Sequence, residues 1–421
     1  RGNRFDGADD ADVVVMIPDA IDLTQGNTFS GVDPATASDA DLFAIEDRIY
    51  HGADDASFGL ARLVPGRVFV TPNSGGVQVG VNAASAGDVV VVAPGDYTAE
   101  GVVLVPASKA YLTLEGAGAK VRGFDVRADG VTIDGFEVEL DANAQVVGVT
   151  VAARNVTLNG LDIRNAATFD DRTNGFAVQV PTGADASGFT MTGGSIANVT
   201  YGVFADTAVT TPTTLTGVLI EDVSLSDVTW KGMYFEALAD ATIRDVTMEN
   251  VGWYGGGIGT GQEGSWGTGI DINLKYGDYA NIALEGVSAT DTGWSYGTAS
   301  GAGDKAADSD PNGAAIAIRA RNDGGYAAAP ATLTNVVIDG LDVTESRTGV
   351  RFGEPGKDNE HVGAVVRNST FTAPSVAGVT AYGIVNESVS DVDATTGNAF
   401  DGVAVWDGSD AAGRGEVHGA P

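Results

Sequence analysis

A glycine followed by a short apolar alternation recurs throughout the C-terminal half of this chain. Nine repeats of this kind begin at Gly148, Gly175, Gly202, Gly232, Gly269, Gly313, Gly349, Gly378 and Gly402, and successive glycines are 24 to 44 residues apart. Self-similarity at such a period indicates a solenoid, in which each repeat buries its apolar face against the next one. We therefore expect a chain built of stacked repeats.

Each repeat also contains a second alternating stretch, as in VTLNGLDI from Val156, ATIRDVTM from Ala241 and VVIDGLDV from Val336. Period-two patterning rich in β-branched residues and broken by Gly, Asn and Asp predicts short strands. No repeat contains a helical pattern long enough to form a crossover helix. The strands can then stack only as the rungs of an all-β parallel β-helix, about 4.8 Å apart.

Residues 65–104 contain the stretch AGDVVVVAPGDY. This segment resembles the opening rung and N-terminal cap of right-handed parallel β-helix proteins, the pectate-lyase-like superfamily, as found in large bacterial secreted and cell-surface proteins. The handedness is implied by this resemblance, and the later repeats share only its general pattern. Just before it, Ser38 precedes a stretch in which Leu42, Ile45 and Ile49 share one face, which predicts a short capping helix.

We divide the chain into an N-terminal cap or association region at 1–64, a parallel β-helix at 65–393 and a C-terminal joint or association segment at 394–421. The formal net charge of −34 argues against nucleic acid and anionic membrane surfaces as partners. No run of eighteen apolar residues predicts a membrane span, and the absence of Cys excludes a disulfide framework. The sequence starts at Arg1 without Met or a signal peptide, as a processed chain or a fragment would. We expect an extracellular or cell-surface protein.

The motif GN-x-F-x-G occurs at Gly2, Gly26 and Gly397. The longer matches TQGNTFSGV and TTGNAFDGV are each followed by His-Gly, at His51 and His418. This echo between the two ends predicts self-association, end to end or lateral, because open β-helix ends expose unpaired backbone. The alternative is a simple turn that buries one Phe.

The segments before the repeat glycines lengthen in the middle of the chain and carry aromatic residues. A row of rings on one side of the solenoid could stack on sugars, since aromatic faces are large, rigid apolar surfaces. The alternative is that the rings anchor long loops. The candidate glycan-binding residues are Trp230, Trp253, Tyr254, Trp266, Trp294 and Tyr296.

Strand alternation predicts which side chains face outward. If Ile270, Ile272 and Leu274 point into the core, then Asp271, Asn273 and Lys275 point away from it. The same register predicts an outward patch of charged side chains. Its catalytic candidates are Glu236, Asp271, Lys275, Arg319 and Arg351. In the β-helix lyases and epimerases that the chain resembles, this face carries calcium-binding acids and an Arg or Lys base. Charges on a solenoid surface also form solvated ladders, which is the alternative.

Motif comparison weakens an enzymatic interpretation. The Asp-Pro-His-Glu signature of alginate epimerases and the ordered aspartate and His-Gly elements of polygalacturonases are absent, and the three His residues are dispersed. A loop with Asp304, Asp308 and Asp310 has the oxygen ligands that calcium prefers, although its spacing matches neither an EF-hand nor a nonapeptide calcium repeat. Calcium is thus the cofactor to test, with a solvated loop as the alternative.

These patterns favour a structural or adhesive role, as a rod segment of a cell-surface or filament-forming assembly. Two alternatives remain open. One is a polysaccharide lyase, epimerase or glycosidase, and the other is a noncatalytic glycan-binding spike that uses the aromatic loops.

Overall fold

The computed structural model describes residues 2–7, 11–141, 146–166, 175–254, 266–295, 305, 312–354, 357, 360–406 and 414–419. The chain forms two compact units. The N-terminal unit comprises Arg1–Glu139 and Ala153–Asp162, and the C-terminal unit comprises Leu140–Ala152 and Ile163–Pro421. Within the described ranges, no helix is both long and apolar enough to span a membrane.

The N-terminal unit is built from short parallel strand pairs. Strands β1, β2 and β3 pair in parallel with β4, β5 and β6, so the first two turns of the chain already stack. These strands are β1 (Arg4–Phe5), β2 (Val13–Val14), β3 (Ile21–Asp22), β4 (Thr28–Phe29), β5 (Ile49–Tyr50) and β6 (Ala61–Arg62). Helix α1 (Asp39–Glu46) lies between β4 and β5, and Ser38 and Asp41 form its capping box. Its predicted role as a cap of the β-helix stays a prediction.

Further parallel turns follow in the same unit. Strand β7 pairs with β8, β8 with β11, β11 with β14, and β9 with β12. The elements are β7 (Arg67–Val70), α2 (Val77–Ala83), β8 (Val89–Val92), β9 (Gly95–Asp96), η1 (Thr98–Glu100), β10 (Val102–Val105), η2 (Ala107–Lys109), β11 (Thr113–Glu115), β12 (Ala119–Val121), β13 (Gly123–Val126), β14 (Thr132–Asp134), β15 (Glu137–Leu140) and β17 (Thr157–Asn165).

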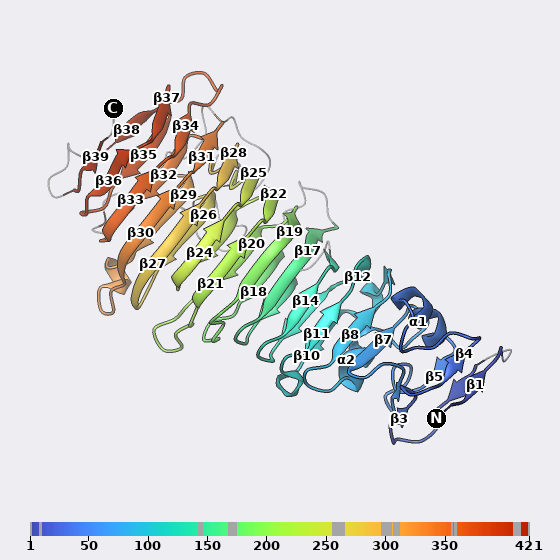
Figure 1. Ribbon diagram of the computed structural model, residues 1–421. Helices are drawn as coiled ribbons and strands as arrows, with labels where there is room; N and C mark the ends of the chain where they lie inside the picture. The colour runs from blue at the N-terminus through green and yellow to red at the C-terminus, as the bar shows by residue number, and fades with distance from the viewer. Residues whose placement is uncertain are drawn as a thin grey trace. The chain divides into compact units, whose positions relative to one another are not determined.

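The C-terminal unit contains the parallel sheet on which the candidate site lies, and we call this sheet the front sheet. Each of its strands pairs in parallel with the next one along the chain (Figure 1). They are β16 (Val146–Val151), β18 (Gly175–Val180), β20 (Tyr201–Ala205), β23 (Lys231–Phe235), β26 (Thr268–Leu274), β29 (Ala314–Ala320), β32 (Thr348–Phe352), β35 (Tyr382–Asn386) and β38 (Ala404–Trp406).

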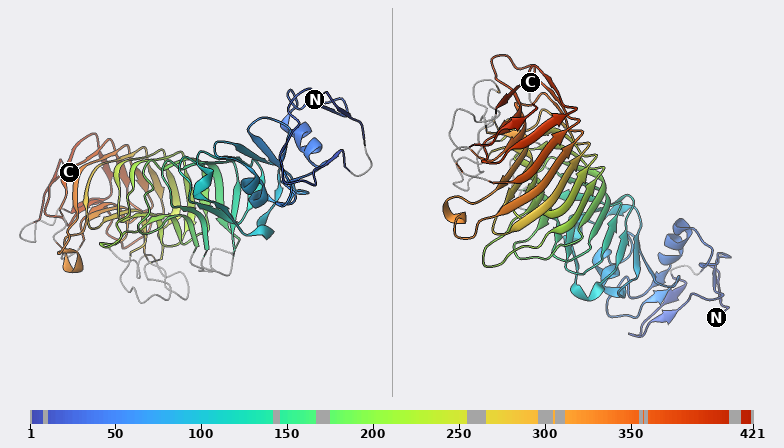
Figure 2. Two further views of the ribbon diagram at one scale, coloured as in Figure 1. Left: turned by 90° about the horizontal axis from the view of Figure 1, so that it is seen from below. Right: turned by 60° about the vertical axis from the view of Figure 1, so that its left-hand side comes forward.

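The remaining strands of this unit also pair in parallel with those of the next turn, so that successive turns of the coil stack on one another (Figure 2). They are β19 (Thr190–Ala197), β21 (Thr216–Glu221), β22 (Ser224–Val228), β24 (Ala239–Arg244), β25 (Thr247–Val251), β27 (Asp278–Glu285), β28 (Ser288–Thr290), β30 (Thr332–Asp339), β31 (Asp342–Thr344), β33 (Val362–Arg367), β34 (Thr370–Thr372), β36 (Val392–Thr396), β37 (Ala399–Asp401) and β39 (Val417–His418). The predicted fold, a right-handed parallel β-helix, is confirmed.

The repeat glycines have a packing reason. Gly202, Gly232 and Gly269 occupy equivalent positions on β20, β23 and β26. A Cβ atom on Gly232 would lie 2.6 Å from the carbonyl oxygen of Gly269, and one on Gly202 would lie 2.2 Å from that of Gly232. The backbones of neighbouring rungs therefore leave room only for glycine or, at Ala315, a methyl group at this position.

The GN-x-F-x-G motifs form rung-to-rung contacts. Phe5 on β1 stacks on Phe29 on β4 with ring centroids 4.7 Å apart, and Phe371 stacks on Phe400 at 5.3 Å. Within one motif, the Nδ2 of Asn27 donates to the carbonyl oxygen of Leu23 at 2.9 Å. The motif is thus a stacked corner of the coil, and its predicted role in association stays a prediction.

Candidate functional site

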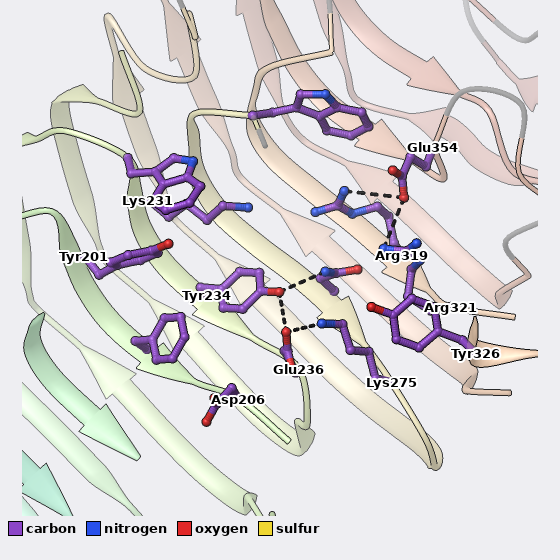
Figure 3. Close-up of a pocket in the computed structure, with 14 residues that line it drawn as sticks. Tyr201, Asp206, Lys231, Tyr234, Glu236, Lys275, Arg319, Arg321, Tyr326 and Glu354 are labelled. Carbon is purple, nitrogen blue, oxygen red and sulfur yellow. Dashed lines mark hydrogen bonds and ion pairs between the residues drawn. The ribbon is translucent and has the colours of Figure 1, made fainter. Parts of the chain in front are cut away.

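A cleft of about 370 Å³ opens on the outer face of the front sheet (Figure 3). Its lining comes from four consecutive strands, β20, β23, β26 and β29, from residues just before or after them, and from Glu354, which follows β32. Its walls are formed by Tyr201, Phe204, Asp206, Trp230, Lys231, Tyr234, Glu236, Trp266, Asn273, Lys275, Arg319, Arg321, Tyr326 and Glu354. Alternation along β26 explains this, because Ile270, Ile272 and Leu274 are fully buried in the core, whereas Asn273 lines the cleft and Asp271 lies beneath it.

A buried charge triad lies at the floor of the cleft. The carboxylate of Asp271 is fully buried and forms ion pairs with the ammonium of Lys231 and the guanidinium of Arg319. Burial raises the pKa of Asp271, but the charges of Arg319 and Lys231 outweigh it and hold the pKa below its ordinary value. Burial also lowers the pKa of Lys231. Asp271 therefore stays ionised and serves as the shared counterion of two cations.

A second network surrounds Glu236. Its Oε1 accepts a hydrogen bond from the hydroxyl of Tyr234 at 2.6 Å and forms an ion pair with Lys275. The Nδ2 of Asn273 donates to the Tyr234 oxygen at 3.0 Å, and the backbone N–H of Thr207 donates to Glu236 Oε2 at 3.1 Å. Burial, followed by the charges of Glu236 and Asp271, raises the pKa of Tyr234 well above its ordinary value. Tyr234 is thus a fixed donor at neutral pH.

Two arginines form the far end of the cleft. The Nη1 atoms of Arg319 and Arg321 lie 3.8 Å and 3.4 Å from Glu354 Oε2. The guanidinium of Arg321 also grips Asp323 with two hydrogen bonds, of 2.7 and 3.0 Å, and lies 4.5 Å from the ring centroid of Tyr326. These contacts hold both guanidinium groups in place, and the side chain of Arg321 stays 11% exposed.

Aromatic rings form the other end. Phe176 stacks on Tyr201 with centroids 5.0 Å apart and an interplanar angle of 6°, and Phe204 stacks on Tyr234 at 5.3 Å and 21°. Trp230 lies 5.1 Å from Tyr201. These five rings, which we call the aromatic platform, come from three successive rungs because the register sets equivalent positions side by side.

Several buried polar atoms at the cleft have no hydrogen-bond partner among the described residues. They are Nε1 of Trp230, Oδ1 of Asn273 and Nε of Arg319, all on side chains of residues less than 9% exposed. A buried donor or acceptor without a partner costs free energy, about 1–3 kcal/mol for a typical group. Such atoms at the wall of a cleft are therefore suited to bind the polar groups of a ligand.

The structure brings several predicted site residues together. Glu236, Lys275, Arg319, Trp230 and Trp266 all line the cleft, and Asp271 lies beneath it. The guanidinium of Arg319 lies 4.9 Å from the ring centroid of Trp266. Four of the five residues of the predicted outward patch and two of the six predicted aromatic residues thus belong to one site.

Other candidates lie elsewhere. Arg351 is buried and pairs with Glu387 at 2.7 Å, beyond the residues that line the cleft. Trp253 and Tyr254 are buried and pack edge to face at 6.1 Å, and Trp294 is fully buried. None of these three rings lines the cleft. Tyr296, Asp304, Asp308 and Asp310 lie outside the described residues.

Sequence reasoning missed several cleft residues as site members. Lys231 directly precedes the repeat glycine of its rung, and Asp206 follows β20. Arg321 and Tyr326 lie just beyond β29, the latter in η3 (Gly324–Tyr326). The position before the glycine was a usable signal for Lys231. The part of the chain that the structure describes contains no group of three or more His, Cys, Asp or Glu side chains that could hold a metal ion.

No protein-family model and no curated protein sequence matches the chain. Among solved structures, the chain is similar to a tailspike protein mutant of E. coli bacteriophage HK620 in complex with a hexasaccharide, at 12% identity and a TM-score of 0.45, over 79% of this chain and 56% of that one. It is also similar to the catalytic domain of a GH87 α-1,3-glucanase in complex with tetrasaccharides, at 13% identity and a TM-score of 0.42, over 83% of this chain and 67% of that one. A third similar structure is endo-xylogalacturonan hydrolase from Aspergillus tubingensis, at 15% identity and a TM-score of 0.42, over 84% and 96% of the two chains. The chain thus spans just over half the length of the tailspike chain.

Proposed function

We propose that the front-sheet cleft binds a carbohydrate and that this protein is an extracellular or surface glycan-binding β-helix. The observation that carries the proposal is the junction, within one cleft, of the aromatic platform with buried polar atoms that lack partners. Sugar rings combine apolar C–H faces with hydroxyl groups, so a glycan can satisfy both kinds of surface at once. Few other ligand classes have this combination along an extended shape.

The cleft dimensions support an oligosaccharide rather than a single sugar. The walls draw on five consecutive rungs, through strands β20, β23, β26 and β29 of the front sheet and through Glu354, which follows β32. At a rung spacing of about 4.8 Å, four intervals amount to about 19 Å. A chain of several sugars laid along the stacking direction would contact every rung.

The electrostatics support binding rather than turnover. Asp271 is held ionised by Lys231 and Arg319, so it is unsuited to donate a proton. Glu236 already accepts bonds from Tyr234, Lys275 and a backbone N–H group. Among the residues that line the cleft there is no His. Polysaccharide cleavage stays a second possibility that a product assay can test.

The test is a glycan array probed with labelled protein, followed by calorimetric titration of the best oligosaccharide. Tyr326→Ala removes a half-buried ring at the cleft rim, and Tyr111→Ala removes a ring that is 69% exposed in the N-terminal unit. We expect the first variant to lose about tenfold or more in affinity, and the second none, because ring contacts contribute about 1 kcal/mol or more beyond area. Equal affinities in both variants, or no binding on the array, would reject the proposal.

Turnover is measured on the same oligosaccharides. Release of new reducing ends, or the absorbance of an unsaturated sugar product, would show that the protein cleaves the oligosaccharide and does not only bind it. The variant for this arm is Glu236→Gln, which keeps the shape of a side chain that faces the cleft. We expect no product from either protein.

A second candidate function is self-association through the GN-x-F-x-G corners. Its support is that these motifs pack ring on ring against the adjacent rung, at Phe5 with Phe29 and at Phe371 with Phe400. The same contact could be repeated between two copies. Sedimentation velocity over a range of protein concentration tests it, and a constant monomer mass with and without calcium would reject both end-to-end and lateral assembly.

A further inference from the structure

The charge of the cleft differs from that of the protein as a whole. Four cationic and three carboxylate side chains line the cleft, which gives a net charge of plus one, and the Asp271 carboxylate beneath brings the balance to zero. The whole chain carries −34. The cleft is therefore an electrically balanced site on a strongly acidic protein, and such a protein repels polyanions at long range.

From this balance we infer that the cleft takes a glycan of sparse charge, made mostly of neutral sugars with an isolated acidic group. A polymer that carries a carboxylate or sulfate on every sugar is the wrong class of ligand. The inference rests on the proposed function, because it specifies the glycan that the same cleft binds.

The distribution of charge along the cleft supports this class. The aromatic platform comes from β18, β20 and β23, and the carboxylates of Asp206 and Glu236 follow the last two of these strands. An acidic sugar at this end would face two negative side chains. The arginines stand two rungs beyond β23, on and just after β29, about 10 Å further along the stack. Among the residues that line the cleft, the platform end holds Lys231 and Lys275 beside its two carboxylates, whereas the arginine end holds two cations and one carboxylate, Glu354. The surplus of one positive charge therefore lies at the arginine end.

The arginine end has capacity left for one anion. The Nε of Arg319 is buried without a partner, and the contacts of Arg319 and Arg321 with Glu354 are 3.8 and 3.4 Å long. Nitrogen atoms held at these distances can turn to a closer acceptor, since charge-assisted bonds are usually 2.7–2.9 Å long. The side chain of Arg321 is 11% exposed and lines the cleft, so a ligand meets it only from the cleft side. The isolated acidic group is assigned to this end.

The other cleft atoms without partners match neutral hydroxyl groups. Oδ1 of Asn273 can only accept, and Nε1 of Trp230 can only donate. A hydroxyl group can both donate and accept a hydrogen bond. A carboxylate next to Asn273 Oδ1 could not bond to it, because both groups are acceptors. Neutral sugars are therefore assigned to the middle of the cleft and to the aromatic platform.

The experiment compares glycans by charge density. An array presents oligosaccharides of equal length with no acidic group, with one acidic group among several neutral sugars, and with an acidic group on every sugar. The tightest acidic ligand is then titrated beside its carboxyl-reduced counterpart, against the native protein, Arg321→Gln and Arg367→Gln. Arg367 is an exposed partner of Asp339 on β33, away from the cleft, and serves as the matched control.

We expect the sparse class to bind best. Reduction of its acidic group should lower affinity about tenfold, as expected for one hydrogen bond to a charged group. Arg321→Gln should cause the same loss and remove the difference between the two ligands, whereas Arg367→Gln should change nothing. Thermal melting of both variants confirms that they fold.

Several results would overturn the inference while the proposed function stands. Fully acidic oligosaccharides could bind best, neutral ones could bind as well as the sparse class, or the reduced ligand could keep its affinity. An effect of Arg367→Gln equal to that of Arg321→Gln would also overturn it, because the loss would then reflect net charge alone. If no glycan of any class binds, the proposed function itself fails.

Discussion

Replacing Asp271 with asparagine tests whether the triad beneath the cleft holds the C-terminal unit together. The substitution preserves the shape of the side chain and removes the negative charge between Lys231 and Arg319. The side chains of Asp271, Lys231 and Arg319 are 0%, 8% and 6% exposed, so water cannot solvate the two cations once the carboxylate charge is removed. Removal of one partner from a buried ion pair typically costs about 3–5 kcal/mol.

The matched control is Glu221→Gln, which breaks the pair between Glu221 and Arg244 on the same unit. These two side chains are 24% and 41% exposed, and such a pair is worth about 0.2–1 kcal/mol. Urea unfolding followed by circular dichroism gives the free energy of unfolding of each variant. It is calculated from the urea concentration at the midpoint, provided that the dependence of this free energy on urea concentration is the same in both variants. We expect Asp271→Asn to lose at least three times as much as Glu221→Gln.

The loss should also depend on pH. Without Asp271, the pKa of Lys231 in the folded state falls further below the value of 10.5 that the unfolded chain has. A lowered lysine pKa destabilises the folded state at low pH, and the penalty fades as pH rises toward the unfolded pKa. The variant should therefore regain stability between neutral pH and about pH 10. Equal losses in the two variants, or a loss independent of pH, would refute the reasoning.

Three further outcomes are expected. Gly232→Ala should cost about 1–3 kcal/mol in urea unfolding, because its Cβ would lie 2.6 Å from the Gly269 carbonyl oxygen, whereas Gly325→Ala, which meets nothing within 4 Å, should cost far less. Burial lowers the pKa of His361 from 6.5 to about 4, so stability should fall by on the order of 3 kcal/mol as pH drops from 6.5 to 4, and His361→Gln should flatten this part of the profile of unfolding free energy against pH. Trp294→Ala should lower the free energy of unfolding by about 3–5 kcal/mol, with glycan affinity little changed in the protein that remains folded.

The fold could be predicted because its determinants are local. The alternation in GIDINL places Ile270 and Ile272 inward and Asp271 outward whatever surrounds them. The repeat glycines also reflect a local demand, the close approach of neighbouring backbones. At the repeats marked by Gly175 and Gly313, however, the structure aligns Ala177 and Ala315 with that position, two residues later, because alanine also fits there. At the repeat marked by Gly378 it aligns Gly383, five residues later.

The burial of the charge triad could not be read from the pattern. Lys231 and Arg319 are 40 and 48 residues from Asp271 in sequence, and only the register across rungs brings them together. A solvated ladder and a buried triad have the same alternation. What separates them is how deeply neighbouring side chains bury the three charged groups, which the alternation does not show.

The aromatic row was predicted only in part because strand alternation does not show how a ring that lies outside the strands is oriented or buried. Trp253 and Trp294 each follow a glycine with positive φ, Gly252 at 72° and Gly293 at 75°, and both indoles turn inward. The Nε1 of Trp294 donates to a backbone carbonyl 51 residues later. Trp230 has no such glycine before it and lines the cleft.

The charges under the cleft run across the rungs, at right angles to the strands. Lys231 on β23, Asp271 on β26 and Arg319 on β29 form one line, which Glu354 extends after β32. Stacked repeats ordinarily melt from their ends, one turn after another. If any one of these turns opens, the neighbouring turn is left with a buried charge that has lost its partner. The four turns should therefore exchange their amide hydrogens together, as one cooperative block, whereas the outer turns of the solenoid should open singly.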